Sequence, residues 1–323
     1  MQVLSNKNFS LNGPLAATIG FFDGVHSGHR FLLDELKRLA QERSLPSAVI
    51  TFPTHPRVVL QTDFQPELLT TYEEKIRLLE KTGIDYCIVL DFDLSLAEMS
   101  AEDFIKDMLF EKMNIHSLLI GYDHRFGHNR SDGFDKYVEY GATWRMEVIR
   151  ATSYTDNGLT ISSSKIRNLI HAGDMATANA MLGYNYRLKG QVIEGNKIGR
   201  ALGFPTANIG VTDKYKLIPA FGSYAVHVFV EGVKYKGMLF IGTKTTIDED
   251  VNVSIEVNIF DFCEDIYNKQ ITVEFIDYIR ENKKFPSLDE LKMQLEKDRE
   301  KIIKGAKARR HEGAKGSIVN RKS

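Results

Sequence analysis

The stretch TIGFFDGVHSGHRFLLDEL, residues 18–36, joins a short apolar run to a helical pattern and places His26 and His29 at the junction. The helix expected there carries a leucine face opposite its charged residues, formed by Leu32, Leu36 and Leu39. A strand followed directly by an amphipathic helix is typical of a parallel sheet covered by helices. The stretch therefore predicts an α/β fold for this part of the chain.

The same alternation of strand and helix continues through the first half of the chain. Residues 47–52 and 86–92 are strand-like, and residues 72–83 between them have a helical pattern that ends at Gly83. Ser100 is a good N-cap for a further helix over residues 101–114. This alternation favours a parallel sheet with helices on both faces.

After about Gly183 the pattern changes to strand-like segments separated by glycine-rich turns. The most regular segment, residues 251–259, alternates between two sets of side chains. We expect the core to receive Val251, Val253, Ile255, Val257 and Ile259. We expect the other face to carry Asn252, Ser254, Glu256 and Asn258. The second half is predicted to be a small antiparallel barrel or sandwich with a C-terminal amphipathic helix, giving domains of residues 1–184 and 185–323.

Composition excludes several classes of protein. The 42 Lys and Arg residues nearly balance the 43 Asp and Glu residues, so the net charge does not favour nucleic acid or membranes as partners. Cys87 and Cys263 lie far apart, and no disulfide is expected. No apolar run approaches the ~20 residues of a membrane span, and the first residues lack a signal-peptide pattern. We expect a cytoplasmic protein, monomeric or weakly homo-oligomeric, whose basic last twenty residues form a solvated, frayed end.

Three roles are open for His26 and His29 from the residues alone. As zinc ligands they lack a third ligand at a recognisable spacing. As structural residues they would cap the helix. As phosphate-binding residues they would use the free amide groups and the dipole of a helix N-terminus, with glycines that allow close backbone approach: Gly20, Gly24 and Gly28. The surroundings favour phosphate, although neither Walker A nor G-x-G-x-x-G occurs.

Several motifs carry a family resemblance. GFFDGVHSGH (20–29) resembles the HxGH signature of the adenylyl- and cytidylyltransferase superfamily. The motifs that follow have the order seen in prokaryotic bifunctional riboflavin kinase/FAD synthetases: TFPTHP (51–56), GYDHRFGHNRSDG (121–133), ISSSKIR (161–167), GRALGFPTAN (199–208), IEVNIFDF (255–262), IYNKQITVEF (266–275) and ENKKFPSLDELKMQLEKD (281–298). The resemblance covers residues 14–305 or so.

For the first half, the resemblance implies a Rossmann-like domain that adenylylates FMN with ATP, giving FAD and pyrophosphate. Such a transfer depends on in-line positioning and charge neutralisation. The implied catalytic residues are His26, His29 and Arg167. The implied nucleotide- and flavin-binding residues lie in the motif loops: Gly20, Phe22, Asp23, Gly24, Gly28, Asp123, Phe126, Gly127, Ser163 and Ser164.

For the second half, the resemblance implies a β-barrel kinase that phosphorylates the riboflavin 5'-hydroxyl from ATP. Glu256 is the implied base for that hydroxyl. The implied phosphate-binding positions are Gly195, Gly199, Gly203 and Thr206. Thr206 and Asn208 match the positions that hold Mg²⁺, a hard ion that prefers oxygen ligands. We expect Mg²⁺ as cofactor and ATP, riboflavin and FMN as substrates.

The chain also departs from the family pattern. His124 stands where the family usually has Phe, and other departures are Ser223, Thr245, Asn258 and Asn268. These leave two alternatives to the bifunctional enzyme. One is a chain with a working kinase and a weakened adenylyltransferase. The other is a nucleic-acid-binding protein that uses the barrel and the basic tail, which the neutral overall charge argues against.

Overall fold

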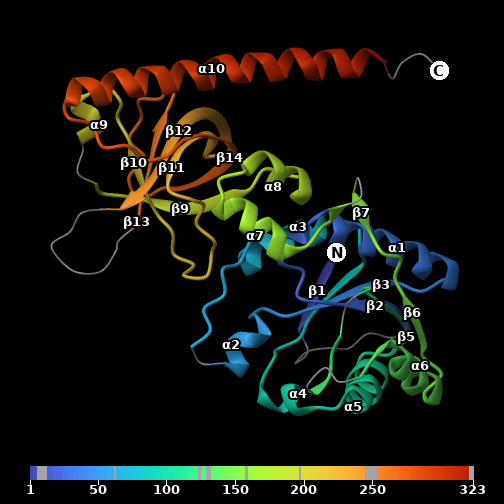
Figure 1. Ribbon diagram of the computed structural model, residues 1–323. Helices are drawn as coiled ribbons and strands as arrows, with labels where there is room; N and C mark the ends of the chain where they lie inside the picture. Colours follow the sequence, from blue (N-terminus) through green and yellow to red (C-terminus); the bar gives the residue numbers. More distant parts are fainter. Residues whose placement is uncertain are drawn as a thin grey trace. The chain divides into compact units, whose positions relative to one another are not determined.

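The computed structural model describes residues 1–5, 13–61, 63–122, 125–128, 132–156, 159–195, 198–243 and 253–319, and the side chains of the last helix to residue 305 (Figure 1). The chain separates into two compact units. The sheet unit comprises Met1–Arg167, Met181–Gly183 and Tyr215–Leu217. The barrel unit comprises Asn168–Ala180, Tyr184–Lys214 and Ile218–Ser323.

The sheet unit is built on six parallel strands in the order β1-β4-β3-β2-β5-β6. Their bounds are β1 Gln2–Ser5, β2 Leu15–Ile19, β3 Ser47–Thr51, β4 Tyr86–Val89, β5 Ile115–Ile120 and β6 Glu147–Arg150. The main helices are α1 Ser27–Arg43, α2 Pro56–Leu60, α3 Tyr72–Glu80, α4 Leu94–Glu98, α5 Ala101–Asp103, η2 Phe104–Lys112 and α6 Phe134–Thr143. The short elements are the 3-10 turn η1 Asp23–Val25 and the strand pair β7 Thr155–Asp156 and β8 Leu159–Thr160.

Alternate residues of the buried strands pack into two separate cores. Ala17 and Ile50 face α5, η2 and α6, whereas Ala16 and Val49 face α1 and α3. The period of two follows from the pleat, which sends successive side chains to opposite faces. Both faces are covered, and the predicted doubly covered parallel sheet is confirmed (Figure 1).

The strand order places one strand end at a topological switch. From β2 the chain runs to β3 and then β4 on one side, while β5 pairs with β2 on its other side. Ligands of open α/β sheets bind beyond the carboxyl ends of the strands at such a point. The loop after β2 leads to the two histidines at the start of α1, and the GYDHRFG motif follows β5. The fold therefore brings the two motif loops to one edge of the sheet.

Local sequence accounts for the helix ends. Thr71 and Glu74 form a reciprocal capping box at the start of α3, and Ser100 caps α5 as expected. The predicted helix over residues 101–114 changes to a π-helical stretch at Phe104. In α1, Leu36 and Leu39 of the predicted leucine face are buried, but the third buried leucine is Leu33, and Leu32 is only partly buried.

The barrel unit is a closed six-stranded barrel in the order β10-β13-β12-β11-β14-β9. The strands are β9 Arg187–Ile193, β10 Ala207–Gly210, β11 Gly222–Val230, β12 Val233–Thr243, β13 Val253–Ile259 and β14 Gln270–Arg280. The helices of this unit are α9 Ile198–Ala201 and α10 Leu288–Val319, while α7 Ser163–His171 and α8 Met175–Leu182 each span a division between the units, after Arg167 and after Ala180. Ile302 of α10 packs in a small core with Phe204, Ala225, Met238 and Phe260.

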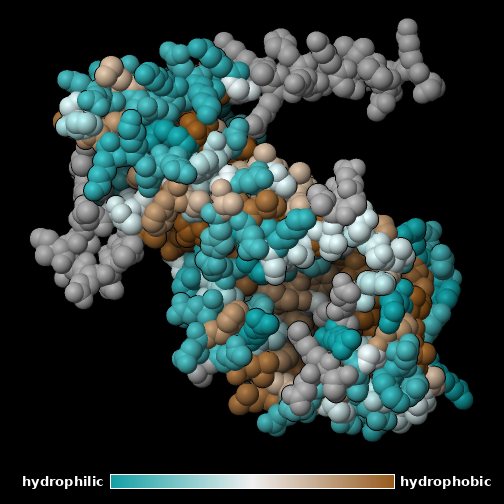
Figure 2. Space-filling view, viewed as in Figure 1, coloured by the Kyte–Doolittle hydropathy of each residue, from teal (hydrophilic) through white to brown (hydrophobic). Residues whose placement is uncertain are grey.

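Two expectations for this half need correction. Val253 was placed in the core, but it is 44% exposed because it stands at the start of β13, beyond the closed part of the barrel. Val251 lies outside the described residues. The C-terminal helix continues to Val319 through the segment expected to be frayed. Figure 2 shows that the surface over the first part of α10 is mainly hydrophilic.

The two units are not separated by a single boundary in the sequence, because segments of each alternate along the chain. Asn168–Ala180 groups with the barrel, and Met181–Gly183 and Tyr215–Leu217 group with the sheet. Ser27 Oγ and Arg30 Nη2 donate to the carbonyls of Met181 and Leu182, which attaches that short segment to α1. A boundary between residues 184 and 185 stays a prediction. The two cysteines are free, as expected.

Candidate active sites

The histidine pair lies at the start of α1. His26 is 5% exposed, and its Nδ1 accepts the backbone N–H of His29 at 3.2 Å, which caps the helix. The two imidazole rings stack with centroids 3.6 Å apart. Burial, helped by the nearby Arg30 guanidinium, lowers the pKa of His26 to about 4. His26 is therefore neutral at pH 7, and its proton sits on Nε2 because Nδ1 is an acceptor.

His26 can combine two of the three roles that the sequence left open, that of a helix cap and that of a phosphate-binding residue. His26 is a structural cap, and its Nε2–H is still a donor for a phosphate oxygen; it does not supply a positive charge. Among the described residues, no group of three His, Cys, Asp or Glu side chains could hold a metal ion. The geometry gives no support to the zinc alternative.

Asp23 anchors the positive charge of the site. Its carboxylate is 3% exposed and accepts the backbone N–H groups of Leu69 and Thr70, each at 3.1 Å. It also accepts the Arg167 guanidinium, with Nη2 at 2.9 Å from Oδ2. Arg167 is thus held in place by a buried partner and keeps 23% of its side chain exposed. The contacts of Asp23 are with protein groups, and its predicted role in nucleotide or flavin binding stays a prediction.

The start of α7 meets the same loop. Ser163 Oγ donates to the backbone carbonyl of Asp23 at 2.9 Å, and Ser164 Oγ lies 3.5 Å from Arg167 Nη1. Gly28 allows the His26 ring to lie beside the backbone, since an added Cβ would come within 3.3 Å of that ring. The structure therefore brings together residues from the two ends of the sheet-unit sequence.

The remaining predicted residues of this loop are buried. Phe22 packs in the core under α1, and its ring occupies the space where a Cβ on Gly20 would point. Gly24 adopts a left-handed φ of 79°, and a Cβ there would come within 2.8 Å of Leu69. These buried residues therefore determine the backbone conformation of the loop.

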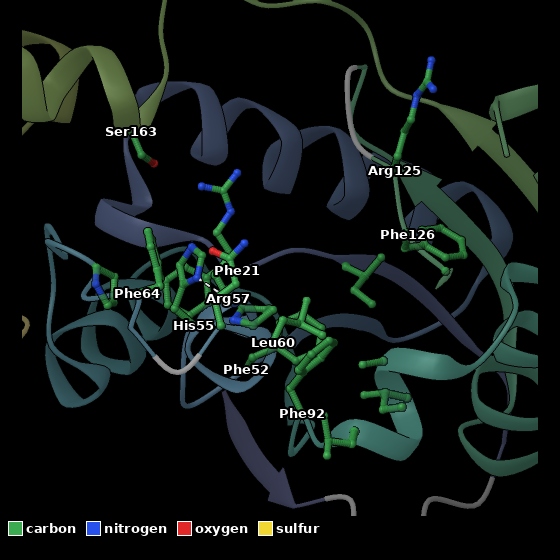
Figure 3. A pocket seen from close by; sticks show the side chains of 18 of the residues that line it. Phe21, Phe52, His55, Arg57, Leu60, Phe64, Phe92, Arg125, Phe126 and Ser163 are labelled. Carbon is green, nitrogen blue, oxygen red and sulfur yellow. Dashed lines mark hydrogen bonds between the residues drawn. The ribbon is translucent and has the colours of Figure 1, made fainter. Parts of the chain in front are cut away.

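A cavity of about 1030 Å³ opens beside this loop (Figure 3). Aromatic side chains form much of its wall, including Phe21, Phe52, His55, Phe64 and Phe92, while Ser163, Ser164 and Arg167 supply polar groups. His55 stands edge-on to Phe21 with ring centroids 4.8 Å apart. Such a wall suits a flat aromatic ligand with a charged end. Figure 2 shows apolar surface on this unit.

Sequence reasoning quoted TFPTHP as a motif but gave no role to its His55, nor to the buried Lys75. The ammonium of Lys75 donates to the carbonyls of Phe21 and Phe52 and lies 4.0 Å from the centre of the Phe21 ring. Burial lowers the pKa of Lys75 to about 8. This lysine ties the loops after β2 and β3 together. A lysine within a helical pattern gives no signal of such a role.

The GYDHRFG loop is described only in part. Phe126 lines the cavity and stacks on Tyr137 with centroids 4.3 Å apart. Gly127 has a φ of 85°, and a Cβ there would come within 2.8 Å of the backbone of Ala101. Only glycine fits so close an approach. Asp123 and His124 lie outside the described residues.

The second candidate site lies on two neighbouring barrel strands. Asn208 of β10 stands opposite Glu256 of β13 in the antiparallel register. Glu256 accepts the hydroxyl of Thr206 at 3.3 Å and that of Ser254 at 3.0 Å. Asn258, one of the departures from the family pattern, donates to the Pro205 carbonyl at 2.7 Å. The structure therefore brings Thr206, Asn208 and Glu256 together, as predicted.

Three glycines near this site are each constrained by their local geometry. A Cβ on Gly195 would come within 1.9 Å of the Asn208 side chain, and a Cβ on Gly199 would come within 2.3 Å of the Phe204 carbonyl. Gly203 ends α9 with a φ of 81°. The sequence suggested a flexible phosphate loop, whereas each glycine has a local steric reason.

The donor set fits a hard cation. Asn208 Oδ1 is buried and has no hydrogen-bond partner among the described residues. A buried amide oxygen left in this state costs free energy unless something binds it. Thr206 Oγ1 and the Glu256 carboxylate add further oxygen donors nearby. Oxygen groups of this kind are what Mg²⁺ prefers.

A smaller cavity of about 460 Å³ adjoins Thr206. Its wall combines core residues of the barrel with the loop over residues 262–267 and with Arg200. Val257 and Ile259 line it, whereas Glu256 points to the other side of the same strand. Thr206 is the residue that touches both the cavity and Glu256. The loop over residues 262–267 was quoted within motifs, but none of its residues was assigned to the site.

Both halves of the chain match known families. A family model described as FAD synthetase matches residues 9–165, and one described as riboflavin kinase matches residues 182–305. No helix in the described part of the chain is long and apolar enough to cross a membrane.

Curated relatives cover most of the chain. A bifunctional riboflavin kinase/FMN adenylyltransferase of Haemophilus influenzae is 39% identical over 91% of this chain and 95% of its own length. The protein of the same description from Escherichia coli K12 is 36% identical over 87% of this chain and 89% of its own length. A Streptococcus pneumoniae crystal structure described as a macrolide-efflux protein is 31% identical, covering 93% of this chain and 98% of its own, with a TM-score of 0.85.

Proposed function

This chain belongs to the family of bifunctional riboflavin kinase/FMN adenylyltransferases, and we propose that each of its two units carries one of the two reactions. The barrel unit phosphorylates riboflavin to FMN with ATP. The sheet unit adenylylates FMN to FAD with a second ATP and releases pyrophosphate. An enzyme with only one working module is not favoured, because both family models match and the bifunctional relatives span the chain.

The observation that carries the adenylyltransferase assignment is the meeting of His26, His29 and the Asp23-anchored Arg167 at the carboxyl end of β2. In this reaction an FMN phosphate oxygen attacks the α-phosphorus of ATP. The new P–O bond forms as the bond to the pyrophosphate oxygen breaks, and the electron pair leaves with pyrophosphate. The attacking phosphate is already ionised, so the site requires donors and positive charge in fixed positions.

The residues divide this work by their charge. Arg167 supplies a permanent positive charge and a fork of donors suited to phosphate. His26 donates from Nε2 without a charge of its own, as its lowered pKa requires. The starts of α1 and α7, which meet through the hydrogen bond from Ser163 to Asp23, would add the favourable dipoles of helix N-termini. The aromatic cavity beside them would take the flavin ring.

In the kinase unit, Glu256 accepts the proton of the riboflavin 5'-hydroxyl as that oxygen attacks the γ-phosphorus of ATP; the bond from this phosphorus to the bridging oxygen breaks, and ADP leaves with the electron pair. Thr206 and Asn208 would hold Mg²⁺, which when bound would neutralise the negative charge of the phosphates. The orphaned Asn208 Oδ1 supports this placement. The 460 Å³ cavity next to Thr206 would take part of a substrate.

Incubation of the pure protein with riboflavin and Mg-ATP, followed by chromatography of the flavins, tests both assignments. FMN should form first and FAD should follow. The same assay started from FMN isolates the adenylyl transfer. A protein that forms neither product would contradict the proposal. The cytoplasmic location, the oligomeric state and a boundary between residues 184 and 185 stay predictions.

A further inference from the structure

The carboxylate that anchors Arg167 rests on a short segment of main chain, Leu68–Thr71. The amides of Leu69 and Thr70 donate to Asp23, and the hydroxyl of Thr70 accepts the N–H of Gly24 and lies 3.3 Å from Asp23 Oδ1. Any shift of this segment moves the carboxylate. The position of the Arg167 guanidinium therefore depends on what holds Leu68–Thr71.

Residues from much later in the sequence hold it. Leu68 donates to the carbonyl of Tyr215 at 2.6 Å and accepts the N–H of Leu217 at 2.9 Å, as in a parallel bridge. Between them, Lys216 Nζ donates to the Leu69 carbonyl at 2.7 Å, 147 positions away in the sequence. Tyr215–Leu217 groups with the sheet unit, so these contacts lie within one compact unit.

The Lys216 ammonium has a second partner in the same place. It pairs with Glu74 Oε2 at 2.6 Å, and that oxygen also accepts the backbone N–H of Thr71. The Lys216 side chain is only 2% exposed. A buried ammonium is stable only when such partners are present. The ammonium thus connects both ends of Leu69–Thr71, one through a carbonyl and the other through the Glu74 carboxylate.

We propose that Lys216 is a positioning residue for adenylyl transfer: it holds Leu68–Thr71, which holds Asp23, which orients Arg167 toward the phosphates. The inference rests on the proposed function of the sheet unit. It goes further because the residue lies in the part of the sequence that matches riboflavin kinase. Lys216 itself touches no substrate in this account.

The first test replaces Lys216 by Met in the full chain, with both activities measured on the same preparation. Adenylylation of supplied FMN should fall by about 10- to 100-fold, because a small misplacement of a phosphate-binding group is costly. Phosphorylation of riboflavin should stay near the parental rate. Lys216→Arg, which keeps the charge and the donors, should recover most of the loss.

Lys37 offers a matched control. It also donates to a carbonyl, that of Thr82, and pairs with a carboxylate, that of Asp34, each at 2.7 Å. Both contacts lie away from Leu68–Thr71. Lys37→Met should leave both activities unchanged. If Lys216→Met does not fold, Lys216→Gln keeps one N–H donor for the Leu69 carbonyl and replaces it in every comparison.

A double-mutant cycle with Arg167→Ala separates positioning from general stability. If Lys216 acts through Arg167, its replacement should lower the remaining adenylylation of Arg167→Ala less than about 3-fold. A merely structural lysine would lower the rate by the same factor in both backgrounds, and that result would overturn the proposal. Parental adenylylation in Lys216→Met would also overturn it. Absence of adenylylation in the unmodified chain would instead contradict the proposed function.

Discussion

The two units assemble their candidate sites in different ways. In the barrel unit, Thr206, Asn208 and Glu256 lie on or beside two paired strands. The Glu256 carboxylate is held there by a hydrogen bond from another side chain, that of Thr206. In the sheet unit, the buried Asp23 is held by main-chain amides and orients Arg167. The difference follows the chemistry. A base must reach its substrate and exchange a proton, whereas donors to an already ionised phosphate must be fixed before the reaction.

The largest effect is expected from Glu256→Gln. The amide keeps the size of the side chain, and its one oxygen can still accept a hydroxyl of Thr206 or Ser254 while its NH2 group donates to the other, but it cannot take the proton of riboflavin. FMN formation should fall by roughly 100- to 10,000-fold. Adenylylation of supplied FMN should remain near the parental rate, because that reaction needs no base. Initial rates from riboflavin and from FMN measure the two effects.

Glu231→Gln, in an exposed turn of the same unit, is the matched control and should change neither rate. Unchanged kinase turnover in Glu256→Gln would show that Glu256 is not the base for the riboflavin hydroxyl. Equal loss of both activities would indicate a folding defect or a single shared site.

His29→Ala should have the converse effect. The substitution keeps the backbone N–H that bonds His26 Nδ1, so the cap of α1 survives. Loss of a preorganised donor typically costs ~100-fold or more, and this loss should fall on FAD formation from FMN alone. His116→Ala is a matched control, since His116 is a partly buried histidine on β5 of the same unit. FAD formation at the parental rate would show that His29 does not bind phosphate.

A smaller effect concerns the pH dependence of the stability of the sheet unit, to which His26 contributes. His26 has a folded pKa of about 4 against 6.5 in the unfolded chain, so between these values the unfolded state binds more protons. The free energy of unfolding is therefore highest above pH 6.5 and falls toward pH 4 by up to about 3 kcal/mol. His26→Asn keeps a capping acceptor without a titratable ring and should lack this part of the pH dependence.

Urea unfolding between pH 7 and 4.5, monitored by the fluorescence of Trp144, the single tryptophan of the chain and part of the sheet unit, would measure this contribution. The decline toward low pH should be shallower in His26→Asn than in the parental chain. Parallel pH profiles would mean that His26 carries a proton in the folded state, and the neutral-donor role would be lost.

The smallest effect tests whether α8 belongs to the barrel unit or to the sheet unit. Asn179 donates to the Phe275 carbonyl at 2.8 Å and accepts the N–H of Tyr186 at 2.7 Å, both within the barrel unit. Asn179→Ala should destabilise the barrel by about 2 kcal/mol, at about 1 kcal/mol for each hydrogen bond. Kinase activity should then be lost at lower urea concentration, with the midpoint for adenylylation unchanged.

Thr177→Ala, on the same helix, should shift neither midpoint. A shift of the adenylylation midpoint in Asn179→Ala would assign Asn168–Ala180 to the sheet unit. The fold would then divide near residue 184, as the sequence predicts.

The sequence predicted what depends on local pattern. The alternation of strand and helix in the first half, and of apolar and polar residues in β13, gave the correct architecture and placed Glu256 opposite the core set. The strand pattern alone did not distinguish a barrel from a sandwich, and the family resemblance predicted the barrel, which is confirmed. Closure depends on β9 pairing with both β10 and β14, and no local pattern encodes those partners.

The errors and omissions have physical reasons. Val253 continues an apolar alternation but lies at a strand end, where the barrel no longer covers it. Periodicity reports which face a residue shares, without saying how far along the strand the core extends. Lys75 and Lys216 were missed because their partners are main-chain carbonyls, which have no sequence signature.

The placement of Tyr215–Leu217 within the sheet unit has a consequence for recombining relatives of this chain. A chimaera joined near residue 184 would take Glu74 from one parent and Lys216 from the other. Such a hybrid inherits a buried ion pair whose halves were selected in different proteins. Joining the chains is then safe only where both parents have the same pair, or where residues 215–217 are transplanted together with the first half. The segments that must be exchanged together to preserve FAD formation are therefore not contiguous in the gene.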